Sequence, residues 1–191
     1  MNSDETVWPV DDPESELIRE VYARYGLAMF MAQVLEHAIV NMLLMLRFLP
    51  TRPDYTNAAS WEGAFDDFCA GEFGKTFGNM LRTLESLELV PAVLLARLRQ
   101  AKNVRDCLAH SFFRDNDLAF MTQQGRAQMI AFCDDAVGEF KAIDIEIDEL
   151  CASQRDRYGI TIEWLEQKFM EMQAQAIELS MVSPAAGGPI V

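Results

Sequence analysis

The sequence predicts an all-α protein: an up-and-down bundle of four main helices with one or two short or C-terminal extra helices. Three observations predict this class. Apolar residues recur every three or four positions over long stretches. Ten glycines and seven prolines in 191 residues are too few for a turn-rich all-β protein, and 50% hydrophobic residues suffice for a full-sized core. We expect a flexible acidic N-terminus over 1–12, a single helical domain over 13–180 and a disordered tail over 181–191.

The first and longest pattern runs from about Pro13, which suits a first helical turn, and either Asp12 or Ser15 could be its N-cap. It predicts a helix to about Leu49 with two apolar stripes, and Glu36 is the one polar member of the main stripe. The main stripe is Ile18, Tyr22, Tyr25, Met29, Ala32, Glu36, Ile39, Leu43 and Leu46, and the second is Val21, Ala28, Leu35, Met42 and Leu49. A face this broad must be covered by several neighbouring helices. Because polar residues interrupt the stretch, we expect no membrane span.

Pro50 and Pro53 end this pattern, and three further helices are expected before the middle of the chain. They are a short helix over 61–70 with Phe65, Phe68 and Cys69 inward, a helix over 73–87, and a helix opened by Pro91 that extends to Phe112. In the last of these, the inward row again contains one polar residue, Arg105.

Two more helices are expected in the C-terminal half, capped by Thr122 and Thr161. Residues 143–148 alternate with the period of a strand, but we assign them to helix because the surrounding thirty residues repeat at helical spacing. The inward residues expected of the two helices are Met129, Cys133, Val137, Phe140, Ile147 and Leu150, and then Trp164, Leu165, Phe169, Met172 and Ala176.

The charge is unevenly distributed along the chain. The formal net charge of −14 argues against a broad phosphate-binding surface. One helix is nevertheless basic, because residues 97–114 contain five bases and the single acid Asp106; the bases are Arg97, Arg99, Lys102, Arg105 and Arg114. This basic island would attract a small anion or one phosphodiester. Alternatively, these bases pair with acids of adjacent helices.

Arg105 and His110 are candidates for acid–base chemistry on a phosphate. Histidine titrates near neutrality and can move a proton, while a guanidinium stabilises charge that develops on phosphoryl oxygens. Five residues of straight helix separate the two by about 140° around the axis and about 7.5 Å along it. They share a face only if the helix ends or bends between them or if the long arginine side chain reaches round the helix, and the sequence 112–116 that follows suits a helix end.

The segment Lys102-Asn-Val-Arg-Asp-Cys-Leu-Ala-His-Ser-Phe-Phe113 resembles the signature of the HEPN superfamily (higher eukaryotes and prokaryotes nucleotide-binding). That signature is an arginine, a polar residue directly after it, and a histidine separated from the arginine by four to six residues. Arg105, Asp106 and His110 match it at the shortest spacing, with aspartate where bacterial relatives more often have asparagine. Residues 25–36 resemble the family's first helix and residues 77–81 its glycine-containing helix, so the resemblance spans about 22–140.

The resemblance implies a helical bundle acting as a metal-independent endoribonuclease, often a toxin of a toxin–antitoxin pair, with two protomers bringing their motifs together and no cofactor. The products would be 2′,3′-cyclic phosphate and 5′-hydroxyl ends. Arg105 and His110 would be catalytic and Asp106 supporting, and we expect Lys102, Asn103 and Arg114 to contact the RNA. Other members have lost catalysis. The alternative is therefore a catalytically silent homodimer that binds a nucleotide or a protein, or serves as a scaffold.

Glu36 connects the helix pattern with this site. It interrupts one apolar row and Arg105 interrupts another, and charges inside a protein are tolerated mainly as pairs. We predict that the two side chains face each other, with Glu36 orienting Arg105 or the imidazole. In the alternative, Glu36 lies at a wet edge of its helix.

The remaining polar groups suggest less chemistry. Four cysteines without a paired spacing and two histidines do not form a zinc pattern, so we expect the cysteines to be small buried hydrophobes and no metal to bind. His37 forms a polar stripe with Gln33 and Asn41, which we expect to be a solvated face. The acidic stretch 134–149 predicts another solvated face or a surface for a basic partner such as an antitoxin. An acidic start without a signal-peptide pattern predicts a reducing cytoplasm.

Overall fold

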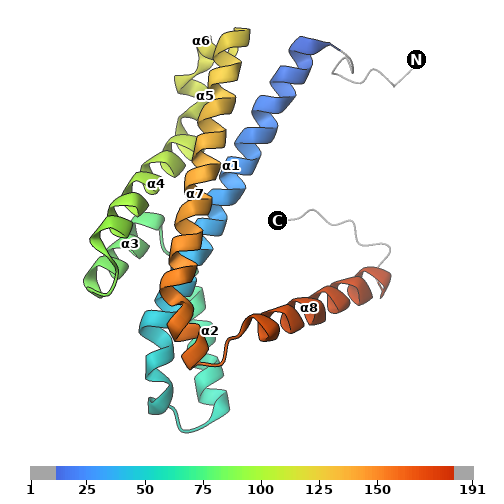
Figure 1. Cartoon of the computed structure of the whole chain (residues 1–191). Coiled ribbons are helices and arrows are strands. Elements are labelled where there is room, and N and C mark those ends of the chain that lie inside the picture. Colours follow the sequence, from blue (N-terminus) through green and yellow to red (C-terminus); the bar gives the residue numbers. More distant parts are fainter. Residues whose placement is uncertain (1–11, 183–191) are drawn as a thin grey trace. The chain divides into compact units, whose positions relative to one another are not determined.

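The computed structural model of the chain describes residues 12–182, and every regular element within this range is helical, which confirms the all-α prediction. The expected flexible N-terminus, apart from residue 12, and the expected tail from residue 183 lie outside the described residues. The chain forms two compact units, one reaching to Cys151 and the other starting at Ala152. Figure 1 traces the helices of both in chain order.

Helix α1 (Pro13–Leu43) begins at one of the two predicted caps, where the Asp12 carboxylate accepts a hydrogen bond of 3.1 Å from the Ser15 amide. This bond to the backbone lowers the pKa of Asp12 below its usual value. The expected single helix to Leu49 is wrong in its last turn: the chain continues as a π-helix, η1 (Leu44–Phe48), and a 3₁₀ helix, η2 (Leu49–Asp54). The winding changes because Pro50 and Pro53 have no N–H to continue the α-helical series.

The two stripes of α1 are not equally buried. The second stripe, expected only to widen the face, is the true core: Val21, Ala28, Leu35 and Met42 are completely inaccessible. The main stripe lies at the border of the buried face, because Tyr22 is exposed and Glu36 is half-buried, although Ala32, Ile39 and Leu43 are in the core.

The first unit continues with α2 (Ala58–Phe73), α3 (Phe77–Ser86) and α4 (Ala92–His110). The caps Asn57 and Thr76 accept hydrogen bonds from the Ser60 and Asn79 amides. Phe65, Phe68 and Cys69 of α2 are half-buried, and α3 buries Phe77, Met80, Leu81 and Leu84. Helix α4 contacts both α1 and α3. The expectation that the third helix begins at Phe73 is wrong, because Phe73 ends α2 and is exposed.

Ser111 ends α4, with φ −136° and ψ −12°, so the expected continuation to Phe112 is wrong. Two short turns follow, α5 (Phe112–Asp115) and α6 (Asp117–Phe120), and then α7 (Gln123–Arg157), whose residues up to Cys151 belong to the first unit. Thr122 caps α7 as predicted, because its hydroxyl oxygen accepts a hydrogen bond of 3.0 Å from the Gly125 amide.

The assignment of 143–148 to helix is confirmed, since α7 runs through it. Ile143 and Ile147 are buried, while Ile145 between them is exposed, as helical spacing requires. Of the six residues expected to face inward, Met129, Cys133, Phe140 and Ile147 are buried and the other two, Val137 and Leu150, are half-buried.

The helical stretch Pro13–Asp54 is long and apolar enough to cross a membrane by length and composition alone. Half of its most apolar window is buried against other parts of the chain. The core helix of a soluble protein has these same properties, so the stretch carries no argument for a membrane.

The second unit contains the end of α7 and helix α8 (Ile162–Val182). Thr161 caps α8 as predicted, accepting a hydrogen bond of 3.2 Å from the Trp164 amide. The expectation that an apolar face of this helix points inward is wrong: every side chain described in α8, from Ile162 to Leu179, is exposed. The helical spacing of the apolar residues is real, but nothing within the described part of the second unit covers them.

All four cysteines are free thiols, and two of them, Cys133 and Cys151, are buried as expected, while Cys69 and Cys107 are half-buried. Burial raises the pKa of Cys133 and of Cys151 to about 11. We therefore expect iodoacetamide to modify both residues far more slowly than a free thiol at pH 8, because the thiolate is the nucleophile. Peptide mass spectrometry checks this, with urea-unfolded protein as the control, and equal labelling rates in the two states would contradict it.

Candidate functional site

The centre of the candidate site is an ion pair between α4 and α1. Arg105 Nε donates a hydrogen bond of 2.8 Å to Glu36 Oε1, which confirms the predicted pairing. The side chains are 28% and 23% exposed, so the pair lies at the edge of the helix interface and is not sealed. Arg105 Nη1 also donates to Asp106 Oδ1 at 3.2 Å. Two of the five guanidinium N–H groups are thus engaged by carboxylates.

Asp106 lies between two cations of its own helix. Lys102 Nζ donates to Asp106 Oδ2 at 2.5 Å, opposite the contact from Arg105. Partial burial of Asp106 by itself raises its pKa, but the hydrogen bonds and charges of Lys102 and Arg105 prevail and lower it. The stem of Lys102 lies over Gly78 of α3, where a Cβ atom would be 3.1 Å from Lys102 Cε. The supporting role expected of Asp106 therefore has a structural basis, which is to hold Arg105 and Lys102 together.

His110 is the last residue of α4, and it is exposed. No described residue makes a hydrogen bond, ion pair or ring contact with its imidazole. A bend that brought His110 to the face of Arg105 would have to come before His110. The helix instead continues through His110, because the Ser111 amide still donates to the Cys107 carbonyl, so the break comes one residue too late. With unbroken helix from 105 to 110, the two side chains leave the axis about 140° apart. A single chain therefore does not bring the guanidinium and the imidazole to one face.

An aromatic cluster fixes this end of α4 against α1. The Tyr25 hydroxyl donates to the Leu108 carbonyl at 3.3 Å, and the Tyr25 ring stacks on Phe112 with centroids 5.5 Å apart. Phe113 packs against both Tyr25 and Tyr22. Sequence reasoning did not connect these rings, although both tyrosines and both phenylalanines stand in the segments that carry the resemblance.

The bases of the basic island are all paired within the chain. Arg97 contacts Glu139 and Glu146 of α7, and Arg99 donates to Glu85 of α3 at 2.9 Å. Arg114, on α5, is highly exposed and reaches its neighbour Asp115 at 3.2 Å. Of the three residues expected to contact RNA, Lys102 and Arg114 are thus engaged by aspartates, and Asn103 is exposed on α4. The alternative interpretation, pairing with acids of adjacent helices, is confirmed for Arg97, Arg99 and Arg105, whereas Lys102 and Arg114 pair with acids of their own helices.

A cavity of about 230 Å³ adjoins the ion pair. Its lining residues come from α1, from the end of α2 and from the turn and helix that follow: Gln33, Glu36, His37, Val40, Phe73, Lys75 and Met80. The His37 ring meets Phe73 edge-on, with centroids 4.9 Å apart. The predicted solvated stripe of Gln33, His37 and Asn41 is exposed, but two of its members also line this cavity. No sequence signal indicated that Phe73 and Lys75 would come close to them.

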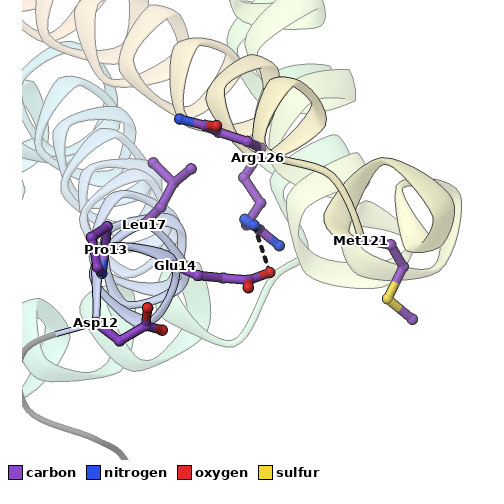
Figure 2. Close-up of a pocket in the computed structure, with 7 residues that line it drawn as sticks. Asp12, Pro13, Glu14, Leu17, Met121 and Arg126 are labelled. Carbon is purple, nitrogen blue, oxygen red and sulfur yellow. Dashed lines mark hydrogen bonds and ion pairs between the residues drawn. The ribbon is translucent and has the colours of Figure 1, made fainter.

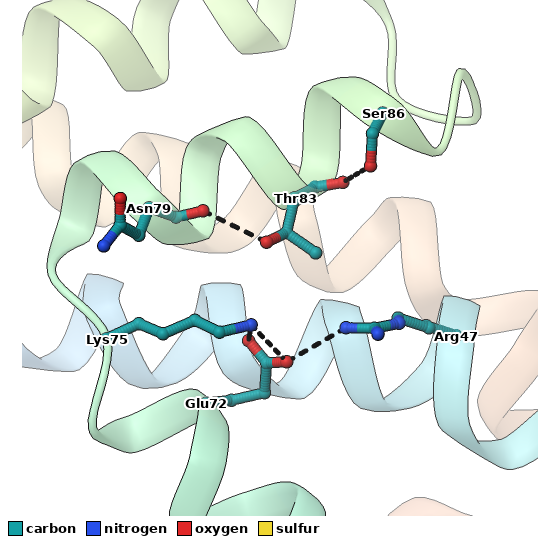
Figure 3. A network of polar contacts seen from close by, with 6 residues as sticks. All are labelled: Arg47, Glu72, Lys75, Asn79, Thr83 and Ser86. Atoms are coloured by element: carbon teal, nitrogen blue, oxygen red, sulfur yellow. Dashed lines mark hydrogen bonds and ion pairs between the residues drawn. The ribbon is translucent and has the colours of Figure 1, made fainter.

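A buried carboxylate holds Lys75 at the rim of this cavity (Figure 3). Glu72 is 4% exposed, and it accepts hydrogen bonds of 2.7 Å from Lys75 Nζ and 3.1 Å from Arg47 Nη1. Two cations therefore compensate one buried acid and tie α2 to η1. Neither the sequence pattern nor the spacing indicated this network.

A larger cavity, of about 440 Å³, lies where α1 and α7 begin (Figure 2). The buried Arg126 projects into it and donates to the Phe120 carbonyl at 2.9 Å and to Glu14 at 3.0 Å. The lining contains two carboxylates, Asp12 and Glu14, against this one guanidinium. That balance does not favour an anionic ligand, so this cavity adds nothing to the phosphate chemistry.

No family model, no curated protein and no solved structure matches this chain. The fold and the site therefore define only a class, an all-α protein with a partly exposed arginine–glutamate pair and an exposed histidine at the end of the helix that carries the arginine.

Proposed function

We propose that the chain is a metal-independent endoribonuclease of HEPN type that cleaves RNA to 2′,3′-cyclic phosphate and 5′-hydroxyl ends. One observation carries the proposal most directly. The Glu36 carboxylate fixes the Arg105 guanidinium at the surface of α4, where three of its N–H groups have no partner among residues 12–182, and the exposed His110, which also has no partner in that range, ends the same helix. This is the group pair that internal attack on a phosphodiester requires.

The reaction uses groups of the chain and of the RNA alone. His110 removes the proton from the 2′-hydroxyl, and the 2′ oxygen attacks the adjacent phosphorus. The P–O5′ bond breaks, and the leaving 5′ oxygen takes a proton from the imidazolium. Arg105 binds the non-bridging phosphate oxygens and stabilises the charge that develops on them. Glu36 is a positioning residue, because it holds Arg105 without touching the RNA.

The active site of this proposal is shared between two copies in a homodimer. Because Arg105 and His110 leave one α4 about 140° apart, the arginine of one copy acts with the histidine of the other. We further propose that α1, α3, α4 and α7 form the four-helix bundle that the resemblance implies. The proposed location is the cytoplasm, and the proposed role is that of a toxin opposed by a protein antitoxin.

A second function, a catalytically silent HEPN-like dimer that binds a nucleotide or a protein, is favoured by a different observation. Every base of the basic island is paired with an acid of the same chain, and the net charge is −14. Few counterions would be released from a long RNA, so its binding would be weak.

Cleavage of a single-stranded RNA in excess chelator distinguishes the two functions. We expect the purified chain to cleave, and His110→Ala to lower the rate by about 100-fold or more, because a positioned acid–base group contributes at least that much. His37→Ala is the matched control, since it removes the other histidine, which is also exposed, and it should leave the rate unchanged.

Two outcomes would contradict the nuclease. Equal cleavage by the wild type and His110→Ala would assign the activity to a contaminant. Absence of cleavage by a folded wild type, with nucleotide binding retained, would favour the silent module.

A further inference from the structure

Within the described part of the second unit, helix α8 buries none of its side chains. Its large apolar side chains are exposed along its whole described length: Ile162, Trp164, Leu165, Phe169, Met170, Met172, Ile177 and Leu179. A 21-residue helix is only marginally stable in water without tertiary packing, and so large an apolar surface marks an interaction site. Nothing within the described part of the second unit covers this face of α8, so its partner lies elsewhere.

The spacing of these residues identifies the partner as another helix. Six residues follow each other by alternating steps of three and four, which are the a and d positions of three heptads: Ile162, Leu165, Phe169, Met172, Ala176 and Leu179. A repeat of 3.5 residues keeps this row facing a second helix in a left-handed coiled coil. Trp164 and Met170 occupy a c and a b position, away from the row.

We infer that α8 pairs with α8 of a second copy of the chain in an antiparallel coiled coil. In that register the row is complementary to itself: Leu165 faces Ala176, Phe169 faces Met172, and Ile162 faces Leu179. A parallel pair would instead stack Phe169 on Phe169 and Ala176 on Ala176, which overfills one layer and leaves another hollow. The antiparallel pair makes the layer volumes more even than a parallel pair would, and it brings sulfur to an aromatic ring.

The charges on α8 agree with a second copy and not with a basic partner on this row. Glu163, Glu171 and Glu178 occupy b and c positions, away from the seam, and Glu171 is paired with Lys168 at 2.6 Å. Beside the seam, the antiparallel register sets Glu166 opposite Gln173 and Lys168 opposite Gln175. No like charges meet across the pair, and the acids remain in water.

The inference does not depend on the proposed function, because this coiled coil forms whether or not the dimer cleaves RNA. Sedimentation equilibrium of the full chain tests it. The wild type should have a mass of twice 21.6 kDa. The double variant Leu165→Gln with Phe169→Gln should have a dimer dissociation constant at least tenfold higher, because apolar area is lost from both copies. The matched control, Trp164→Gln with Met170→Gln, removes exposed apolar residues off the row and should leave the dimer intact. A monomeric wild type, or equal weakening by both pairs of substitutions, would overturn the inference.

Cross-linking tests the orientation. In a chain carrying Leu165→Cys and Ala176→Cys, mild oxidation should join residue 165 of one copy to residue 176 of the other, as identified by peptide mass spectrometry. Leu165→Cys alone should give no 165–165 link. Links from residue 165 to the first unit of the same chain would identify that unit as the cover of α8 and would overturn the inference, as would a 165–165 link.

Discussion

Arg105→Ala is expected to slow RNA cleavage by about 100-fold or more. Glu36 holds the Arg105 guanidinium at the surface of α4, and removal of one group that stabilises a transition-state charge has this magnitude. Arg105→Lys should not restore the rate, because an ammonium cannot bind Glu36 and a phosphate with the planar geometry of a guanidinium.

Arg105→Ala should also lower the free energy of unfolding, by about 1 kcal/mol, because it leaves the half-buried Glu36 without its partner. Partial exposure of the pair keeps the loss below that of a fully buried pair. Urea unfolding measures the loss. Arg99→Ala is the matched control, since Arg99 is an ion-paired arginine of the same helix without a proposed role. If Arg105→Ala cleaves as fast as Arg99→Ala, the site is wrongly assigned.

Gly125→Ala is expected to lower the free energy of unfolding by about 3 kcal/mol, because overpacking a site that cannot yield costs this much. A Cβ atom on Gly125 would lie 2.0 Å from the Ala119 carbonyl oxygen and 2.5 Å from its carbon, so backbone has to move. The clash falls at the start of α7, where the Gly125 amide donates to Thr122, and it also disturbs the neighbouring Arg126.

Gly138→Ala in the same helix supplies the control. A Cβ at Gly138 meets nothing within 4 Å, so alanine should raise the stability by about 0.5–1 kcal/mol through its higher helix propensity. Urea unfolding of the two variants should therefore give changes of opposite sign. A Gly125→Ala protein as stable as Gly138→Ala would contradict the packing described where α6 meets α7.

Much of the fold could be predicted from local rules. The caps Asp12, Thr122 and Thr161 lie where short polar side chains precede an apolar repeat, and each accepts the expected backbone hydrogen bond. The contact of Glu36 with Arg105 was predictable because each is a lone charge in an apolar row, and such charges need each other.

The rest depends on details that a repeat does not encode. Each residue of an α-helix turns the side-chain direction by about 100°, so the exact end of α4 matters. Whether the helix ends at His110 or one residue earlier decides whether His110 can share a face with Arg105. The partners of Arg97 and Arg99 lie on other helices, and they depend on how α3 and α7 are rotated. The cavity beside Glu36 exists because a turn brings Phe73 and Lys75 to α1, which no spacing in the sequence indicates.

The central claim is that the guanidinium of one copy acts with the imidazole of the other. Complementation between two inactive variants tests it most directly. Arg105→Ala and His110→Ala proteins are mixed in equal amounts, allowed to exchange partners, and assayed on RNA in excess chelator. Half of the dimers are then mixed, and each has one complete site of two, so the rate should recover to about a quarter of the wild-type value. A mixture that forms mixed dimers and remains as inactive as either variant alone would contradict the shared site.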